Sequence, residues 1–261
     1  MSFLYLRALV AVIVVGMLAG AILCVELGRQ MGWRRVERLG PEALEGFGAV
    51  EGAVFGLLGL LIAFTFSAAA TRFDARRDLV VKEANRIGTA YRRLDLLPEA
   101  SQPALRAEFR EYLDARLAVY ARIEGMHYPK AEMARVTALQ DRIWNDAVAA
   151  CRAPTLPQTM LLLLPAINEM LDITTDRMVA IRAHVPWPVI VLLLLLMLAC
   201  SILAGYGMAH VRSRSWTHTV AFAAILALTI YVTLDYEFPR LGLIRLDWVD
   251  RVLRDVRASM S

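Results

Sequence analysis

Four long stretches of the 261-residue chain contain no aspartate, glutamate, lysine or arginine. They make up a third of the chain and are Ala8–Val25, Gly52–Thr71, Ala183–Val211 and Ser215–Leu234. A helix needs about 20 mostly apolar residues to cross the hydrocarbon core of a bilayer. The sequence therefore predicts a multi-pass membrane protein whose partner is the lipid bilayer, and it excludes a free-standing soluble enzyme.

The first apolar stretch has some features of a secretory signal peptide, with small residues at Ala19–Ala21 where cleavage would fall. The stretch is long for the apolar part of such a signal. We therefore expect a retained first transmembrane helix rather than a cleaved leader.

The second apolar stretch is expected to continue as a helix into an aqueous region. No proline occurs from Gly48 to Leu97, and the charged residues Asp74, Asp78 and Lys82 keep the four-residue spacing of a helix. A continuous helix of about 50 residues would be about 75 Å long, much more than a bilayer needs. This helix should therefore leave the membrane and enter an aqueous domain.

Residues 72–182 hold 32 of the 54 charged residues and predict that aqueous domain. Further helices are expected at 101–125, 130–152 and 158–183, because glycine and proline interrupt the helical pattern between them. No segment keeps the alternation of a β-strand for long. The uncharged segment 153–168 contains three prolines and is short for a span, which favours a buried or interfacial helix over a re-entrant loop.

The predicted fold is an all-α integral membrane protein with four transmembrane helices and a long second helix that extends into a helical cytoplasmic domain. Residues 1–71 would hold spans 1 and 2, 72–182 the cytoplasmic domain, 183–236 spans 3 and 4, and 237–261 a C-terminal amphipathic helix. We expect this last helix to lie on the membrane or to dock on another subunit. Four spans place both termini and the large domain on one side, and basic residues near the span ends favour the cytoplasm.

The sequence lacks the spacings of common catalytic and metal-binding motifs. It has no glycine-rich phosphate loop, no His-Glu-x-x-His pair, no nucleophile elbow and no Cys-x-x-Cys motif. Its net charge of +4 is scattered and does not indicate a nucleic-acid partner. We therefore expect no enzyme, no cofactor, no metal and no nucleic acid, although acids from distant helices can still converge in a bundle.

One face of the second span combines small and apolar residues with an acid at one end and arginines at the other. At helical spacing this face reads Glu51, Phe55, Leu58, Ile62, Thr65, Ala69, Arg72 and Arg76. Several copies around an axis would form an apolar constriction with charged vestibules, in which the two arginines attract anions. The pattern alone favours ordinary helix packing, with those arginines as membrane anchors.

Two further features of the spans leave alternatives open. Gly48, Gly52, Gly56 and Gly59 form a ridge that lets helix backbones approach closely. Asp235 and Glu237 follow the fourth span and are a candidate cation site, although pairing with Arg240 is favoured. Glu51 fits a pore mouth and an interfacial position equally well.

Several sequence motifs resemble those of bacterial membrane proteins known as the bestrophin-like domain family. The segment Glu51–Ser67 carries the resemblance, and it is continued by Arg72–Arg77, by Glu83–Tyr91 and by the closing motif Asp235–Arg245. The resemblance implies a remote similarity to bestrophins, which are pentameric anion channels with a long pore-lining second helix and a cytoplasmic helical domain. The dense acidic calcium-binding clasp of animal bestrophins has no counterpart beyond Asp235 and Glu237, so calcium gating is not expected.

The resemblance raises the expectation of a pore above that of ordinary packing. We expect a homo-oligomeric ion channel of the bacterial inner membrane, with the second span lining the pore and with inorganic ions as its substrates. Anion preference and a pentameric state are implied only by the family. The alternative is a non-conducting membrane scaffold or sensor whose cytoplasmic helices bind a partner. A membrane enzyme is a third and weaker expectation.

Overall fold

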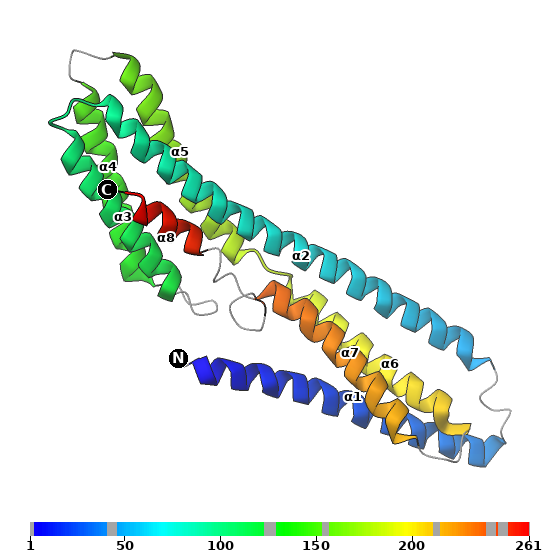
Figure 1. Ribbon diagram of the computed structural model, residues 1–261. Coiled ribbons are helices and arrows are strands. Elements are labelled where there is room, and N and C mark those ends of the chain that lie inside the picture. Colours follow the sequence, from blue (N-terminus) through cyan, green and yellow to red (C-terminus); the bar gives the residue numbers. More distant parts are fainter. Residues whose placement is uncertain are drawn as a thin grey trace. The chain divides into compact units, whose positions relative to one another are not determined.

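The computed structural model describes residues 3–40, 46–122, 129–152, 157–210, 215–238, 244 and 250–260. All regular secondary structure in these ranges is helical, as the sequence predicts (Figure 1). The α-helices are α1 (Phe3–Leu39), α2 (Phe47–Arg93), α3 (Gln102–Arg122), α4 (Lys130–Cys151), α5 (Pro157–Arg182), α6 (Trp187–Gly207), α7 (Trp216–Glu237) and α8 (Asp250–Ala258). Short 3₁₀ helices are η2 (Leu94–Leu96) and η3 (Met208–His210).

Four helical stretches are long and apolar enough to cross a membrane. They are Val10–Leu39, Phe47–Leu96, Gln158–Gly207 and Trp216–Glu237. The prediction of an all-helical protein with four candidate spans is therefore confirmed.

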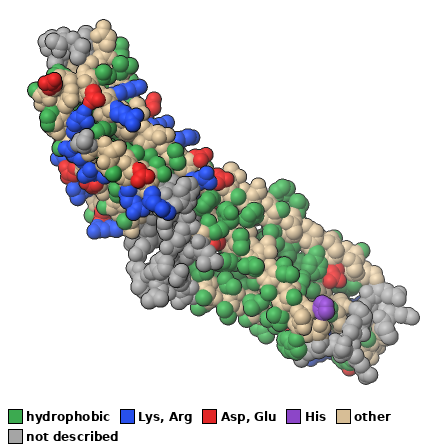
Figure 2. All heavy atoms as spheres, viewed as in Figure 1, with side chains coloured by type: hydrophobic (Ala, Val, Ile, Leu, Met, Phe, Trp, Pro, Cys, Tyr) green, Lys and Arg blue, Asp and Glu red, His purple; other side chains and the backbone are tan. Residues whose placement is uncertain are grey.

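The chain forms two compact units. Unit 1 comprises residues 1–71 and 184–244, and unit 2 comprises residues 72–183 and 245–261. Helix α2 contributes to both, because it runs without a break from Phe47 to Arg93. In Figure 2, hydrophobic side chains dominate the visible surface of unit 1, whereas charged side chains gather on unit 2.

Unit 1 is built on an unusually close contact between α1 and α6. A Cβ atom on Gly28 of α1 would lie 1.9 Å from the carbonyl oxygen of Ile202, and a Cβ on Gly205 of α6 would lie 1.9 Å from that of Val25. No side chain fits at either position, so glycine allows the two backbones to touch. In a bilayer, apolar side chains gain little by moving from lipid to a neighbouring helix. Close packing of the α1 and α6 backbones therefore helps to hold unit 1 together.

Unit 2 is a helical bundle with a continuous apolar core. The second part of α2 packs with α3, α4, α5 and α8 around fully buried side chains that include Phe109, Leu113, Ile143 and Ile167. The helices of this unit begin and end within a few residues of the predicted ranges. Glycine and proline positions in the sequence therefore predicted the ends of these helices well.

Two expectations about unit 2 are resolved by its packing. Residues 157–168 of the uncharged segment lie in α5, so this part is helical, while residues 153–156 lie outside the described ranges. One face of this helix is buried, with Leu163 and Ile167 fully so, whereas Leu161 is 74% exposed. The C-terminal helix was expected on the membrane or on another subunit, but α8 docks on α3 of the same chain. Its Leu253 is fully buried, and Arg257 donates to both carboxylate oxygens of Asp114 at 2.8 and 3.0 Å. This local ion pair and the apolar core of unit 2 together hold the helix there.

Candidate functional site

The predicted pore face of α2 is the face that packs inside unit 1. Leu58, Thr65 and Ala69 are buried, and Phe55 and Ile62 are partly buried. Leu58 belongs to a buried apolar cluster with side chains of α1, α6 and α7, to which Phe55 and Ile62 also contribute. The rings of Phe55 and Phe222 on α7 meet edge to face, with centroids 5.9 Å apart. This face of α2 therefore packs against other helices of the same unit.

The polar residues of this face are also engaged within the chain. The Thr65 hydroxyl donates to the carbonyl of Leu61 at 2.7 Å, one turn earlier in its own helix. The Glu51 carboxylate lies against the end of α6, since a Cβ on Gly207 would be 3.0 Å from its Oε2 atom. The structure therefore favours the packing interpretation for the residues from Glu51 to Ala69.

The opposite face of α2 is open and consists of small and apolar residues. Gly48, Gly52, Gly56 and Gly59 have no heavy atom within 4 Å of the position that a Cβ would take. Ala63 and Ser67 extend this exposed face, and Leu57, Leu60 and Phe64 beside it are more than half exposed. The glycine ridge of α2 therefore meets no other helix within the described part of unit 1.

Arg76, predicted to attract ions in a vestibule, caps a helix of unit 2 instead. Its side chain is buried, with Nε donating to the carbonyl of Ala180 at 3.0 Å and Nη2 to that of Ala183 at 2.6 Å. The last carbonyls of a helix lack partners in their own helix, and a cation there also interacts favourably with the helix dipole. Arg76 therefore ties α2 to the C-terminal end of α5, while Arg72 is partly exposed.

Asp235 and Glu237, the candidate cation ligands, bind backbone amides of the chain. Asp235 Oδ2 accepts from the amide of Ile244 at 3.0 Å, and Glu237 Oε1 accepts from the amide of Val185 at 2.9 Å. Glu237 also contacts His184 Nδ1 at 3.3 Å. The residue proposed to pair with them, Arg240, lies outside the described residues, and within those residues no group of three His, Cys, Asp or Glu side chains is arranged to hold a metal.

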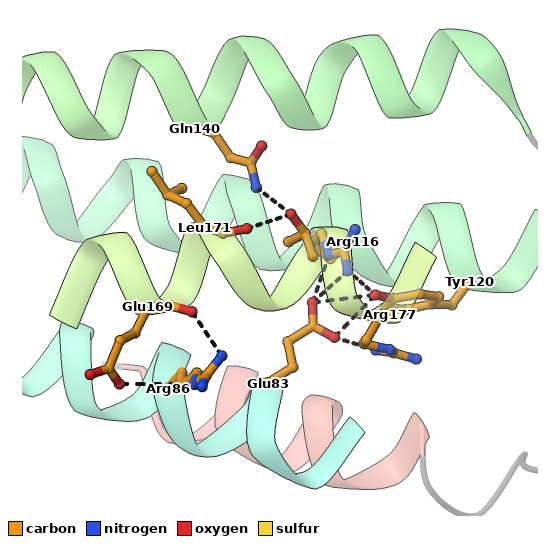
Figure 3. Close-up of polar contacts among 9 residues, drawn as sticks. Glu83, Arg86, Arg116, Tyr120, Gln140, Glu169, Leu171 and Arg177 are labelled. Carbon is orange, nitrogen blue, oxygen red and sulfur yellow. Dashed lines mark hydrogen bonds and ion pairs between the residues drawn. The ribbon is translucent and has the colours of Figure 1, made fainter. Parts of the chain in front are cut away.

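A buried charge cluster in unit 2 was not predicted from the sequence. Glu83 of α2 is fully buried and faces Arg116 and Tyr120 of α3 and Arg177 of α5 (Figure 3). Arg116 approaches Glu83 Oε1 through Nε and Nη2, both at 2.7 Å, and the Tyr120 hydroxyl donates to Oε2 at 3.0 Å. Arg177 donates to Oε2 and lies 3.7 Å above the centre of the Tyr120 ring. One carboxylate therefore joins three helices.

The electrostatics of this cluster keep Arg116 charged in the core. Burial would lower the pKa of Arg116, but Tyr120 and Glu83 outweigh that effect and raise it. Burial raises the pKa of Tyr120 well above its ordinary value, so its hydroxyl stays a hydrogen-bond donor. A neutral hydrogen bond from Gln140 to Thr174, at 3.1 Å, adds α4 to the polar contacts of the bundle. The cluster and this hydrogen bond together link α2, α3, α4 and α5.

The fold and the site together define a multi-pass, all-α membrane protein with a separate charged helical unit. The model of the Bestrophin-like domain matches residues 7–247. The chain belongs to this family, which confirms the resemblance seen in its motifs. Comparisons with curated proteins and with solved structures found no match to the chain.

Proposed function

We propose that this protein is a homo-oligomeric ion channel of the bacterial inner membrane in which the open face of α2 lines the conducting path. Membership of the Bestrophin-like family supports the proposal, because it suggests a distant relation to bestrophin channels. The observation that carries it is the division of α2 into a packed face and a continuous open face of small and apolar residues.

The packed face indicates which residues would line the path. Because α6 and α7 pack behind Leu58 in the same chain, the lumen of a ring of α2 helices would be on the side of α2 away from Leu58. Gly56, Leu60, Ala63 and Ser67 lie on that side at the spacing of one helical face. Leu60, an exposed large apolar side chain, would form the narrow constriction, which gates by losing and regaining water.

In this arrangement α2 leaves the membrane after Thr71, and unit 2 and both termini lie in the cytoplasm, as the basic residues near the span ends favour. The charged surface of unit 2 suits an aqueous surrounding. Anion preference follows only from the family relation.

Cysteine accessibility in liposomes tests the lining residues. The native cysteines Cys24, Cys151 and Cys200 are first replaced by serine or alanine, and ion flux is measured before and after a charged thiol reagent. Leu60→Cys should be blocked by the reagent, whereas the matched variant Leu58→Cys on the packed face should not. Block of Leu58→Cys alone would overturn the assignment of the open face.

Oligomeric state and flux test the channel itself. One helix per chain cannot enclose a central path in a monomer or a dimer, so cross-linking of membranes should give a product larger than a dimer. Absence of flux from purified, correctly folded protein, or cross-linking that stops at a dimer, would overturn the channel. Either outcome would favour a scaffold or sensor that binds a partner through unit 2.

A further inference from the structure

The α3–α4 pair in unit 2 is joined by a second charged cluster, distinct from the one around Glu83. Arg142 of α4 contacts two carboxylates of α3, Glu108 Oε1 through Nε at 3.2 Å and Glu111 Oε2 through Nη2 at 2.6 Å. Arg135 of α4 contacts Glu111 Oε1 at 3.0 Å. Three of the four carboxylate oxygens of Glu108 and Glu111 are therefore paired with guanidinium groups.

The other oxygen of Glu108 is in a different situation. Glu108 Oε2 is buried and accepts no hydrogen bond from any described residue, and the Glu108 side chain is only 12% exposed. Its neighbour across the helix pair is the carboxyl of Asp146, one turn beyond Arg142 on α4. Two ionised carboxylates only accept hydrogen bonds, so they repel each other unless one of them carries a proton.

The net charge of this second cluster also favours one bound proton. The acids are Glu108, Glu111 and Asp146, and the bases are Arg135 and Arg142. With every group ionised the cluster has a net charge of −1, and one proton makes it neutral. Other charged groups packed on α3 have partners outside this cluster: Asp114 binds Arg257 of α8, Arg106 binds Asp95 of η2, and Arg116 binds the buried Glu83 of α2, which also binds Arg177 of α5.

We propose that Glu108 carries a proton that it donates to Asp146, and that the stability this proton gives to the α3–α4 pair is lost as the pH rises towards neutrality, a pH-sensitive switch in unit 2. Protonation satisfies the buried Glu108 oxygen with a hydrogen bond across the helix pair. Deprotonation leaves that oxygen buried without a donor and places two like charges together. This proposal does not depend on ion conduction.

The direction of the pH effect follows from the protonation states. Burial, then the neighbouring Asp146, raises the pKa of Glu108 from 4.5 to about 7, with Arg142 opposing. Between these two values the folded pair holds a proton that the opened pair has lost. The stability of the pair therefore falls as the pH rises through this window, and it becomes constant above it.

Hydrogen exchange on the full-length protein in detergent tests the switch. After correction for the intrinsic exchange rate, protection of α3 and α4 should fall by up to about tenfold per pH unit as the pH approaches 7. Glu108→Gln keeps a hydrogen-bond donor but cannot ionise, so its protection should not change with pH. Glu132→Gln, which removes a carboxylate paired with Arg122 in the same helix pair, is the matched control and should behave like the wild type.

Infrared spectroscopy of the wild type provides a readout that does not depend on a folded variant. A protonated carboxyl band should be present at pH 6 and absent at pH 8, and Asp146→Asn should shift its midpoint to lower pH. The absence of a carboxyl band that titrates between pH 6 and pH 8, or the same pH dependence of exchange in Glu108→Gln and the wild type, would overturn the proposal.

Discussion

Replacing Glu83 by glutamine should destabilise unit 2 more than any comparable change at its surface. The Glu83 side chain is completely buried, and those of its partners Arg116 and Arg177 are 3% and 5% exposed. Water therefore cannot replace the lost carboxylate, and two guanidinium groups remain buried without a counter-charge. Removing one partner from a buried ion pair typically costs about 3–5 kcal/mol.

Thermal unfolding of the full-length protein in detergent, followed with hydrogen exchange in α3 and α5, measures this loss. For a unit of this size the expected cost lowers the unfolding temperature by about 10 °C or more. Glu111→Gln is the matched control, because Glu111 also binds two arginines but its side chain is 40% exposed. Exposed ion pairs contribute about 0–1 kcal/mol, so the control should change little.

Replacing all three charges together, with Glu83→Leu, Arg116→Met and Arg177→Met, should recover most of the stability that Glu83→Gln loses. Apolar residues of similar volume remove the need to desolvate charges in the core. Equal small shifts for Glu83→Gln and Glu111→Gln would refute burial as the source of the effect, as would a triple variant less stable than Glu83→Gln.

Three further substitutions test individual contacts. Gly205→Ala should lower the thermal stability of unit 1 by about 1–3 kcal/mol because its Cβ meets the backbone of α1, whereas Gly56→Ala on the open face should not; equal effects would contradict the close α1–α6 contact. Arg76→Met should cost about 1–3 kcal/mol by removing two charged hydrogen bonds to carbonyls, seen as faster hydrogen exchange at the end of α5; unchanged exchange would exclude the cap. Arg257→Ala should change the stability of unit 2 by less than about 1 kcal/mol but speed proteolysis within α8, and an unchanged cleavage rate would show that apolar packing alone holds that helix.

Helix positions in this chain were predictable because their signals are local. The predicted ranges 101–125, 130–152 and 158–183 correspond to α3, α4 and α5, since proline, glycine and the apolar period act within a few residues. The Glu83 cluster has no such signal. Its arginines are 33 and 94 residues away along the chain, and each of them alone resembles an ordinary surface charge.

The two faces of α2 show what helical spacing alone cannot predict, which is the surface that each face contacts. A stripe of small and apolar residues at that spacing is equally suited to pack on a neighbouring helix or to surround a path, so the pattern from Glu51 to Ala69 identified a face but not its partner. A repeated glycine spacing was present on α1 as well, at Gly28 and Gly32, and this pair makes the close contact with α6. The packing of α2 and the contact between α1 and α6 both depend on where helices distant in the sequence lie. With those helices in place, the glycine ridge of α2 is a small-residue surface that meets no other helix in the described part of unit 1. This is the physical reason for proposing that the ridge lines the conducting path.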